Sequence, residues 1–201
     1  MRAKTKPAAA PRQVRIIGGQ WKRTPLAVLD AEGLRPTPDR VRETVFNWLN
    51  YLLDGAWEGR RCLDLFAGTG ALGFEAASRG AAEVVLVEDH APAVRQLEAT
   101  KAKLRADHVR IQRGDALAAA QSLAARGERF DLVFLDPPYH RDWLVKILPL
   151  CERLTTPSGL VYAEAETPLE NEPAPAWLAG WQVVRADKAG MVFYHLLRRN
   201  S

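Results

Sequence analysis

Cysteine and histidine are scarce in this sequence of 201 residues. The two cysteines, Cys62 and Cys151, do not have the spacing of a metal-binding motif. No two of the four histidines lie four residues apart, the spacing that brings two ligands to one helix face. We therefore expect no bound metal. The cysteines are interpreted as reduced, half-buried thiols, which excludes a disulfide framework.

Long apolar runs are also missing, since no stretch approaches the ~20 residues that span a bilayer. Met1–Pro11 is basic and rich in alanine and proline, without the apolar centre of a secretory signal. These absences predict a cytoplasmic protein with no membrane partner. A cationic transit peptide is disfavoured because this segment contains no serine. The length fits one domain with a short appendage.

Positive charge is concentrated at the start of the chain. Residues 1–42 contain ten Lys or Arg and three Asp or Glu, a net charge of +7, whereas residues 43–201 contain 18 and 21, a net charge of −3. Such a distribution suits contact with a polyanion through its phosphates. A solubilising tail explains the same charge equally well.

The first part of the chain predicts a small extension. Residues 1–12 are expected to be disordered. Val14–Ile17 and Leu26–Leu29 are short apolar runs separated by Gly18 and Gly19, which predicts a β-hairpin within residues 13–36.

A helix is predicted next, at the start of the main domain. Thr37 is a good N-cap, and Pro38 suits the first helical position. Apolar residues then recur at helical spacing for about four turns. The helix is expected to end near Gly55.

From residue 60 onward, strand and helix patterns alternate. The predicted strands are Cys62–Phe66, Glu83–Glu88, Val109–Arg113, Leu132–Leu135 and Leu160–Ala163. The predicted helices are residues 71–79, 91–105, 116–126 and 141–154, the last kinked or ended by Pro149. This order indicates an α/β fold with right-handed crossovers and an open, doubly wound sheet. Trp181–Val184 and Met191–Leu197, joined by Asp187–Gly190, predict a closing hairpin.

A glycine-rich loop, Asp64–Gly73, follows the first of these strands. Ligands bind at the carboxyl ends of strands in such sheets, and glycine lets the backbone approach them closely. Glu88, at the end of the second strand, can accept both hydroxyls of a ribose, and Asp115 can accept an adenine amino group. The candidate cofactor-binding residues are Asp64, Phe66, Gly68, Gly70, Glu88 and Asp115.

Two cofactors fit this loop. Gly68, Gly70 and Gly73 match the dinucleotide fingerprint, and Glu88 has the right spacing for it, so a nicotinamide oxidoreductase is an alternative. Asp64 favours S-adenosylmethionine, because its carboxylate can hold the ammonium end of this donor directly or through water. A dinucleotide loop needs no anion there, since it binds a pyrophosphate.

The fourth strand ends in Asp136-Pro137-Pro138-Tyr139. The prolines hold their predecessors extended and lack N–H groups, so this corner presents hydrogen-bond acceptors only. Asp136 and the Pro137 carbonyl would orient an exocyclic base amine for in-line methyl transfer, while Tyr139 stacks on the base. Asp136 is also a candidate acceptor for the leaving proton. The predicted catalytic residues are Asp136, Pro137 and Tyr139, and the target base must be unpaired or flipped out.

The whole pattern resembles the bacterial 16S rRNA guanine-N2 methyltransferases of the RsmD type. The matching segments span nearly all of the chain beyond residue 12. They are Arg15–Gly19, Arg35–Thr37, Asp39–Thr44, Asp64–Gly73, Asp136–Tyr139 and Lys188–Gly190. The segment around Arg35–Thr44 is the specific one, since the glycine loop and Asp-Pro-Pro-Tyr occur in many amino-methyltransferases.

The resemblance implies a Rossmann-like class I methyltransferase fold. Its sheet would be mostly parallel and seven-stranded, with a C-terminal antiparallel hairpin, an N-terminal extension at 13–36 and a methyltransferase domain at 37–201. It also implies S-adenosylmethionine as cofactor and methylation of N2 of one guanine. The partner would be 16S rRNA or a small-subunit assembly particle, and we expect a monomer. By position, Asp136 and Tyr139 would be catalytic, and Glu88 and Asp115 would hold the cofactor.

The basic N-terminal part is the expected RNA-contacting element. Its candidate residues are Lys22, Arg23, Arg35, Thr37, Arg40 and Arg42. A solvated charged face explains the helix arginines almost as well, and Arg35 can instead order a loop over the cofactor. Other substrates for the same chemistry are a DNA adenine or cytosine amine and a protein glutamine amide. A non-catalytic RNA-binding protein is disfavoured by the intact glycine loop and its acids.

Overall fold

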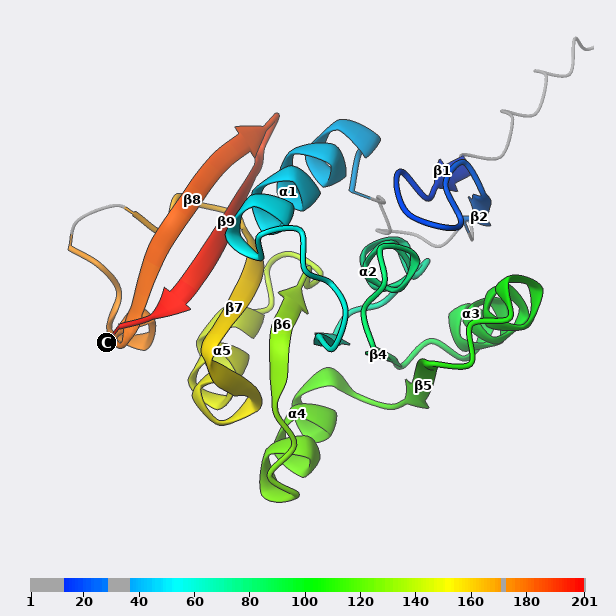
Figure 1. Cartoon of the computed structure of the whole chain (residues 1–201). Coiled ribbons are helices and arrows are strands. Elements are labelled where there is room, and N and C mark those ends of the chain that lie inside the picture. The colour runs from blue at the N-terminus through cyan, green and yellow to red at the C-terminus, as the bar shows by residue number, and fades with distance from the viewer. Residues whose placement is uncertain (1–12, 29–36, 171–172, 201) are drawn as a thin grey trace, which may run out of the picture.

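The computed structural model of the chain describes residues 13–28, 37–170 and 173–200 (Figure 1). Its centre is a seven-stranded sheet in the order β5-β4-β3-β6-β7-β9-β8. The strands are β3 (Arg61–Asp64), β4 (Glu83–Glu88), β5 (Val109–Arg113), β6 (Phe130–Leu135), β7 (Thr155–Ala165), β8 (Trp181–Ala189) and β9 (Val192–Arg199). The helices are α1 (Asp39–Leu52), α2 (Ala71–Ser78), α3 (Ala91–Leu104), α4 (Ala116–Ala125) and α5 (Trp143–Leu154), and a 3₁₀ helix, Ala176–Leu178, precedes β8.

The five strands from β3 to β7 pair in parallel, and β9 pairs antiparallel with both β7 and β8. Each of α2 to α5 returns the chain to the starting edge of the sheet, so the carboxyl ends of the parallel strands all lie at the opposite edge. The predicted α/β fold, with its mostly parallel sheet and closing hairpin, is confirmed.

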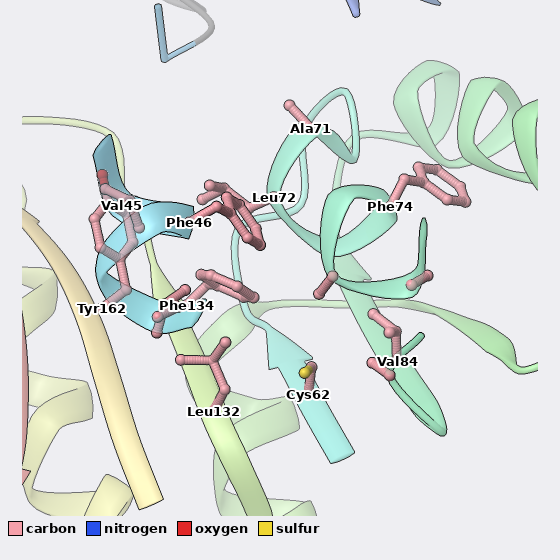
Figure 2. Packing of buried hydrophobic residues seen from close by; sticks show 14 of the residues in the cluster. Val45, Phe46, Cys62, Ala71, Leu72, Phe74, Val84, Leu132, Phe134 and Tyr162 are labelled. Atoms are coloured by element: carbon pink, nitrogen blue, oxygen red, sulfur yellow. The ribbon is translucent and has the colours of Figure 1, made fainter. Parts of the chain in front are cut away.

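Successive strand residues point to two apolar clusters, one on each face of the sheet. Cys62 belongs to the cluster under α1, α2 and α3, where the rings of Phe46 and Phe134 lie 5.9 Å apart (Figure 2). Its neighbour Leu63 belongs to the cluster under α4 and α5. Burial on both faces explains the unbroken apolar runs of these strands. Cys62 and Cys151 are both fully buried, deeper than the half-buried thiols that the sequence predicts.

One prediction about a helix end is wrong. The N-cap of α1 is Pro38, without a side-chain cap, so Thr37 is not the capping residue. The Thr37 hydroxyl binds two carboxylates instead. Pro149 lies inside α5, which continues to the predicted end at Leu154, so of the two predicted effects this proline does not have that of ending the helix. Burial of residues on both sides of this proline, including Leu148 and Cys151, holds α5 together across the missing hydrogen bond.

Strands near the C-terminus are longer than their predicted spans. β7 runs from Thr155 to Ala165 rather than from Leu160 to Ala163, because β6 pairs with its first residue and β9 pairs with it as far as Ala165. β8 continues to Ala189, so only Gly190 and Met191 separate it from β9. Pairing with the neighbouring strands therefore decides where these strands begin and end.

A predicted small hairpin is confirmed at the start of the described chain. Its strands, β1 (Gln13–Arg15) and β2 (Pro25–Ala27), pair antiparallel. The predicted disordered tail, residues 1–12, and Leu29 lie outside the described residues. In the following text, the extension means residues 13–28.

Glu75 and Ser78, in the second half of α2, hold the extension. The fully buried Glu75 carboxylate accepts hydrogen bonds from the backbone N–H of Ile17 at 2.6 Å and of Gly18 at 2.9 Å. The Ser78 hydroxyl accepts from Trp21 N–H at 2.9 Å and donates to the Gly18 carbonyl at 2.6 Å. The extension is therefore part of the packed structure, close above α2 (Figure 1).

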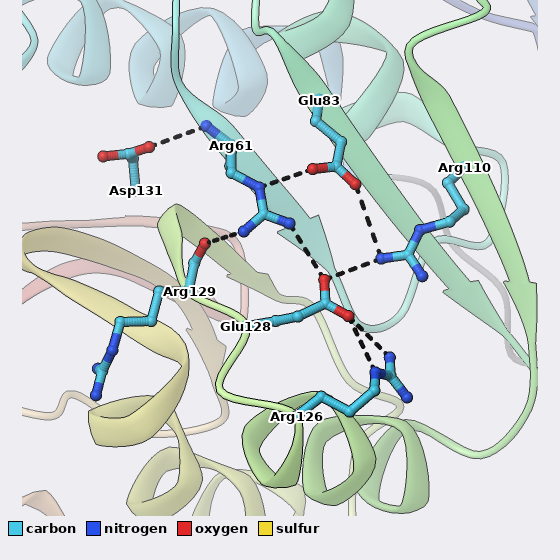
Figure 3. Close-up of polar contacts among 7 residues, drawn as sticks. All are labelled: Arg61, Glu83, Arg110, Arg126, Glu128, Arg129 and Asp131. Atoms are coloured by element: carbon cyan, nitrogen blue, oxygen red, sulfur yellow. Dashed lines mark hydrogen bonds and ion pairs between the residues drawn. The ribbon is translucent and has the colours of Figure 1, made fainter.

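A second polar cluster ties together the opposite, amino edge of the sheet (Figure 3). Arg61 donates to Glu83 at 2.7 Å and to Glu128 at 3.1 Å, and Glu128 also binds Arg110 and Arg126. These side chains are partly exposed, so each ion pair contributes little stability. The cluster joins the starts of β3, β4 and β5 to the end of α4. It therefore lies at the edge opposite the carboxyl ends of these strands.

The close approach of the extension to α2 predicts that Gly19 cannot be replaced. An added Cβ at Gly19 would lie 1.8 Å from the Ser78 carbonyl oxygen, and the residue has a φ of +73°. We expect Gly19→Ala to release the extension, measured as faster hydrogen exchange of residues 14–27. The control is Gly59→Ala, where φ is +79° but no atom lies within 4 Å, so only the backbone cost of about 1 kcal/mol applies. Equal exchange in both variants would contradict this packing.

Candidate active site at the carboxyl edge of the sheet

Five neighbouring strands carry a carboxylate at or just beyond their carboxyl ends. In sheet order from β5 to β7 these residues are Asp115, Glu88, Asp64, Asp136 and Glu164. The strand register places Glu88, Asp136 and Glu164 at one level, with Asp64 two residues deeper. The row accepts hydrogen bonds and repels anions, so it suits a ligand with hydroxyl and amino groups rather than a pyrophosphate.

Asp64 lies beneath the glycine loop and holds its two ends. Its carboxylate is 1% exposed and accepts hydrogen bonds from the N–H of Phe66 at 3.3 Å and of Gly73 at 3.2 Å. Burial raises the pKa of Asp64 to about 7, although the two backbone hydrogen bonds favour the charged form. Besides its predicted role in cofactor binding, Asp64 therefore stabilises the conformation of the loop.

The loop is too tightly packed to accept a side chain at Gly70. An added Cβ there would lie 2.4 Å from the Phe74 ring, and φ is +77°. Gly68, by contrast, has open space around it, and its N–H donates to Glu88 at 2.8 Å. The loop thus presents Gly68 beside Glu88, as expected for a site that a ligand approaches through the backbone.

Glu88 and Asp115 end the two strands beyond β3. Glu88 is half-buried, and its second oxygen accepts from the N–H of His90 at 2.8 Å. Asp115 is exposed and caps α4 by accepting from Ala118 N–H at 2.9 Å. Both therefore have fixed orientations. Phe66, also half-buried, packs edge-on against Trp143 with ring centroids 5.4 Å apart.

The Asp136–Tyr139 corner stands directly after β6. Asp136 is partly buried, and its carboxylate accepts a hydrogen bond from the Thr37 hydroxyl at 2.9 Å. Burial and the nearby Glu164 carboxyl raise the pKa of Asp136 well above its usual range. The Tyr139 ring is 42% exposed, and burial of its hydroxyl with nearby carboxylates raises its pKa to about 12, so it is neutral. An exposed neutral ring can stack on a base.

Glu164 belongs to the site but is absent from the predicted site residues. It is 4% exposed, and its carboxylate accepts from the hydroxyls of Thr37 at 2.9 Å and of Tyr162 at 2.7 Å. The sequence contains one usable signal for it. It is a single acid at the end of an otherwise apolar strand, here the fifth. An acid in the same position identifies Glu88 and Asp136.

The predicted RNA-contacting residues do not form one surface. Lys22, Arg23 and Arg40 are exposed, and Arg35 lies outside the described residues. Arg42 is fully buried and donates to the Arg15 carbonyl at 2.9 Å and to Asp39 at 2.7 Å. Its assignment to RNA binding is therefore wrong: Arg42 joins α1 to the extension.

Thr37 is the second correction in this set. It is 6% exposed, and its hydroxyl is taken up by Asp136 and Glu164 rather than presented to solvent. Its place is therefore in the candidate active site. No group of three or more His, Cys, Asp or Glu within the described ranges is arranged to hold a metal ion. No helix in the same ranges is long and apolar enough to cross a bilayer.

Known proteins share this architecture and sequence. The family described as "Conserved hypothetical protein 95" matches residues 14–198. The chain belongs to this family. A curated relative, the ribosomal RNA small subunit methyltransferase D of Escherichia coli K12, is 42% identical over 94% of this chain and 91% of its own length. The RsmD resemblance inferred from the motifs is thereby confirmed at the level of the family.

Solved structures agree with the family assignment. A putative methyltransferase, yhhF from Escherichia coli, has a TM-score of 0.77 and 38% identity, covering 94% of this chain and 98% of its own. A putative SAM-dependent methyltransferase from Streptococcus mutans has a TM-score of 0.72 at 16% identity, covering 97% of this chain and 57% of its own. The predicted Rossmann-like methyltransferase fold is confirmed, and the expected cofactor, S-adenosylmethionine, agrees with these findings.

The raised pKa of Asp64 predicts a pH dependence of stability. Its folded-state pKa of about 7 exceeds the unfolded value near 4, so the folded chain binds the extra proton between these values. Stability from this group is present below pH ~4 and is lost as the pH rises to about 7. The unfolding free energy of Asp64→Asn minus that of wild type should therefore rise by roughly 2–4 kcal/mol from pH 4.5 to pH 7.5. Chemical denaturation at both pH values measures this change, and a pH-independent difference would contradict it.

Proposed function

We propose that the chain transfers a methyl group from S-adenosylmethionine to the exocyclic N2 of a guanine in 16S rRNA. The observation that carries this proposal is the acceptor corner of Asp136 and Pro137, which stands at the level of Glu88 on the carboxyl edge of the sheet. The family's relatives bear the name of a small-subunit rRNA methyltransferase, which supports RNA as the substrate.

The residues present fit the cofactor. Glu88 and Asp115 supply carboxylate oxygens for ribose hydroxyls and an adenine amine, and Gly68 and Gly70 shape the loop beside them. Asp64 would act on the donor's ammonium end directly or through water, while its oxygens hold the N–H groups of Phe66 and Gly73. Phe66 forms an apolar wall next to Trp143. When bound, S-adenosylmethionine supplies an electrophilic methyl group on a positively charged sulfur.

The acceptor corner favours guanine over the other amino bases. The N2 amine of guanine stands next to the N1–H, so this edge carries adjacent donors, whereas the amines of adenine and cytosine stand next to an acceptor nitrogen. The Asp136 carboxylate can accept from both guanine donors, and neither Pro137 nor Pro138 offers an N–H to an acceptor nitrogen. Tyr139 stacks on the ring, and the amine lone pair is oriented for in-line displacement. A base reaches this corner only outside a helical stack.

The extension is the proposed RNA-binding element, continuing through residues 29–36 to α1. Lys22 and Arg23 of the extension and Arg40 of α1 are the exposed cations proposed to contact phosphates, and Arg35 belongs to the same proposal. Arg15 is exposed as well, but it pairs with Asp39. Arg40 lies three residues from Thr37, whose hydroxyl touches Asp136. Phosphate contacts at these positions would fix the strand while the corner selects the base.

Asp136→Asn tests the catalytic proposal. Replacing one acceptor oxygen by an NH2 group puts a donor against the amine, so we expect methyl transfer to small-subunit particles to fall at least ~100-fold. The binding of S-adenosylhomocysteine, followed by thermal shift, should stay unchanged while NAD gives no shift. Nucleoside mapping of rRNA identifies the methylated base. If the wild-type protein methylated DNA or a protein amide but not rRNA, the proposed substrate would be wrong.

Charge reversal tests the RNA surface. Removal of one cation that binds a phosphate should lower the salt slope of binding by about 0.9, so we expect Arg23→Glu and Arg40→Glu each to weaken RNA binding and flatten this slope. The matched control is Arg198→Glu, an exposed arginine on β9 that pairs with Leu160 of β7 and is not part of the extension or α1. Equal weakening by all three variants would indicate a general charge effect and remove the extension from the interface.

A further inference from the structure

Two hydroxyl side chains, Thr37 and Tyr162, make three contacts with the carboxyl oxygens of Asp136 and Glu164. The Thr37 hydroxyl lies 2.9 Å from an oxygen of Asp136 and 2.9 Å from an oxygen of Glu164. The Tyr162 hydroxyl lies 2.7 Å from the same Glu164 oxygen. Two hydroxyl hydrogens therefore serve three short oxygen–oxygen contacts.

A carboxyl proton completes this set. If Tyr162 and Thr37 both donate to Glu164, the contact between Thr37 and Asp136 needs a hydrogen on Asp136. Glu164 is then the ionised partner, since it receives both hydroxyl hydrogens, and Asp136 is the neutral one. Two carboxylates this close disfavour simultaneous ionisation, as in other buried carboxyl pairs.

No cation offsets the negative charge of this pair within residues 13–28, 37–170 and 173–200, because neither carboxylate forms an ion pair there. The titratable groups that face the pair come from several elements. They are Asp64 from β3, Tyr139 after β6 and Tyr162 from β7. Tyr194 of β9, the register partner of Glu164, lies beside Tyr162, and its hydroxyl binds Asp187. All are acids, so every one that ionises favours retention of the proton.

We propose that Glu164 is a positioning residue that shares one proton with Asp136 through Thr37, and that this proton must leave before Asp136 can accept the guanine amine. This inference rests on the proposed function of Asp136. In the free protein the shared proton reduces the negative charge at the place where a polyanion must approach. Guanine donors then favour the ionised form, so binding of the base is coupled to release of the proton.

The pH dependence of methyl transfer tests this role. Removing the Glu164 charge lets Asp136 ionise at a lower pH, so Glu164→Gln should move the acidic limb of the single-turnover rate down by about one pH unit or more. Thr37→Val removes a hydrogen bond to ionised Asp136 and should move the same limb upward. The control Glu83→Gln removes an acid at the amino edge of β4 and should leave the limb in place.

A spectroscopic measurement checks the proton directly in the free protein. At neutral pH the infrared difference spectrum should contain the carbonyl stretch of one neutral carboxylic acid that is absent from both Asp136→Asn and Glu164→Gln. This readout needs neither cofactor nor RNA, so it remains usable if a variant turns over slowly.

The outcomes separate this inference from the proposed function. A folded Glu164→Gln protein with an unmoved acidic limb and an unchanged carboxylic-acid band would overturn proton sharing, even if Asp136→Asn is inactive. Full activity of Asp136→Asn would instead remove the catalytic role of Asp136. Opposite displacements of the limb in Glu164→Gln and Thr37→Val support the proposal, because a general loss of packing would move both in one direction.

Discussion

The site depends on one constraint: in a parallel sheet, the carboxyl ends of neighbouring strands lie side by side at one edge. Parallel pairing brings residues from five separate segments to one edge, and four of these segments then supply a carboxylate within two residues of each other's level. Two consequences follow from burying acids there. Asp64 becomes a support for the glycine loop, with a raised pKa, and Asp136 acquires a partner in Glu164. The chemistry and the loop geometry thus derive from the same arrangement.

Much of this arrangement could be predicted from the sequence, because its signals are local. Apolar runs identify the buried strands, glycines identify the loop, and Asp136-Pro137-Pro138-Tyr139 marks an acceptor-lined strand end. The alternation of strands and helices also predicts right-handed crossovers and a parallel sheet, but not the order of the strands within it. The boundaries that differ from prediction, at β7 and β8, depend on pairing with β6 and β9, and the local sequence pattern of a strand does not show which strands it pairs with.

The unpredicted residues share a different property: their partners are distant in the chain. Glu75 binds backbone groups 57 and 58 residues away, and Thr37 binds carboxylates 99 and 127 residues away. A buried Glu75 or Arg42 looks like any charged residue on a helix, since spacing alone does not distinguish a solvated face from a face covered by an extension. Periodicity predicts which side of α1 is apolar, but not that Arg42 lies on it.

The anchoring of the extension on α2 joins two regions that would otherwise be independent. α2 has eight residues and so is about 12 Å long. Its first residue follows Gly70 of the cofactor loop, while its second half carries the Glu75 and Ser78 contacts to the extension. A rigid rod this short transmits a displacement of one end to the other. A ligand that displaced α2 at either end would therefore be felt at the other end, and by reciprocity two such ligands would change each other's affinity by the same factor.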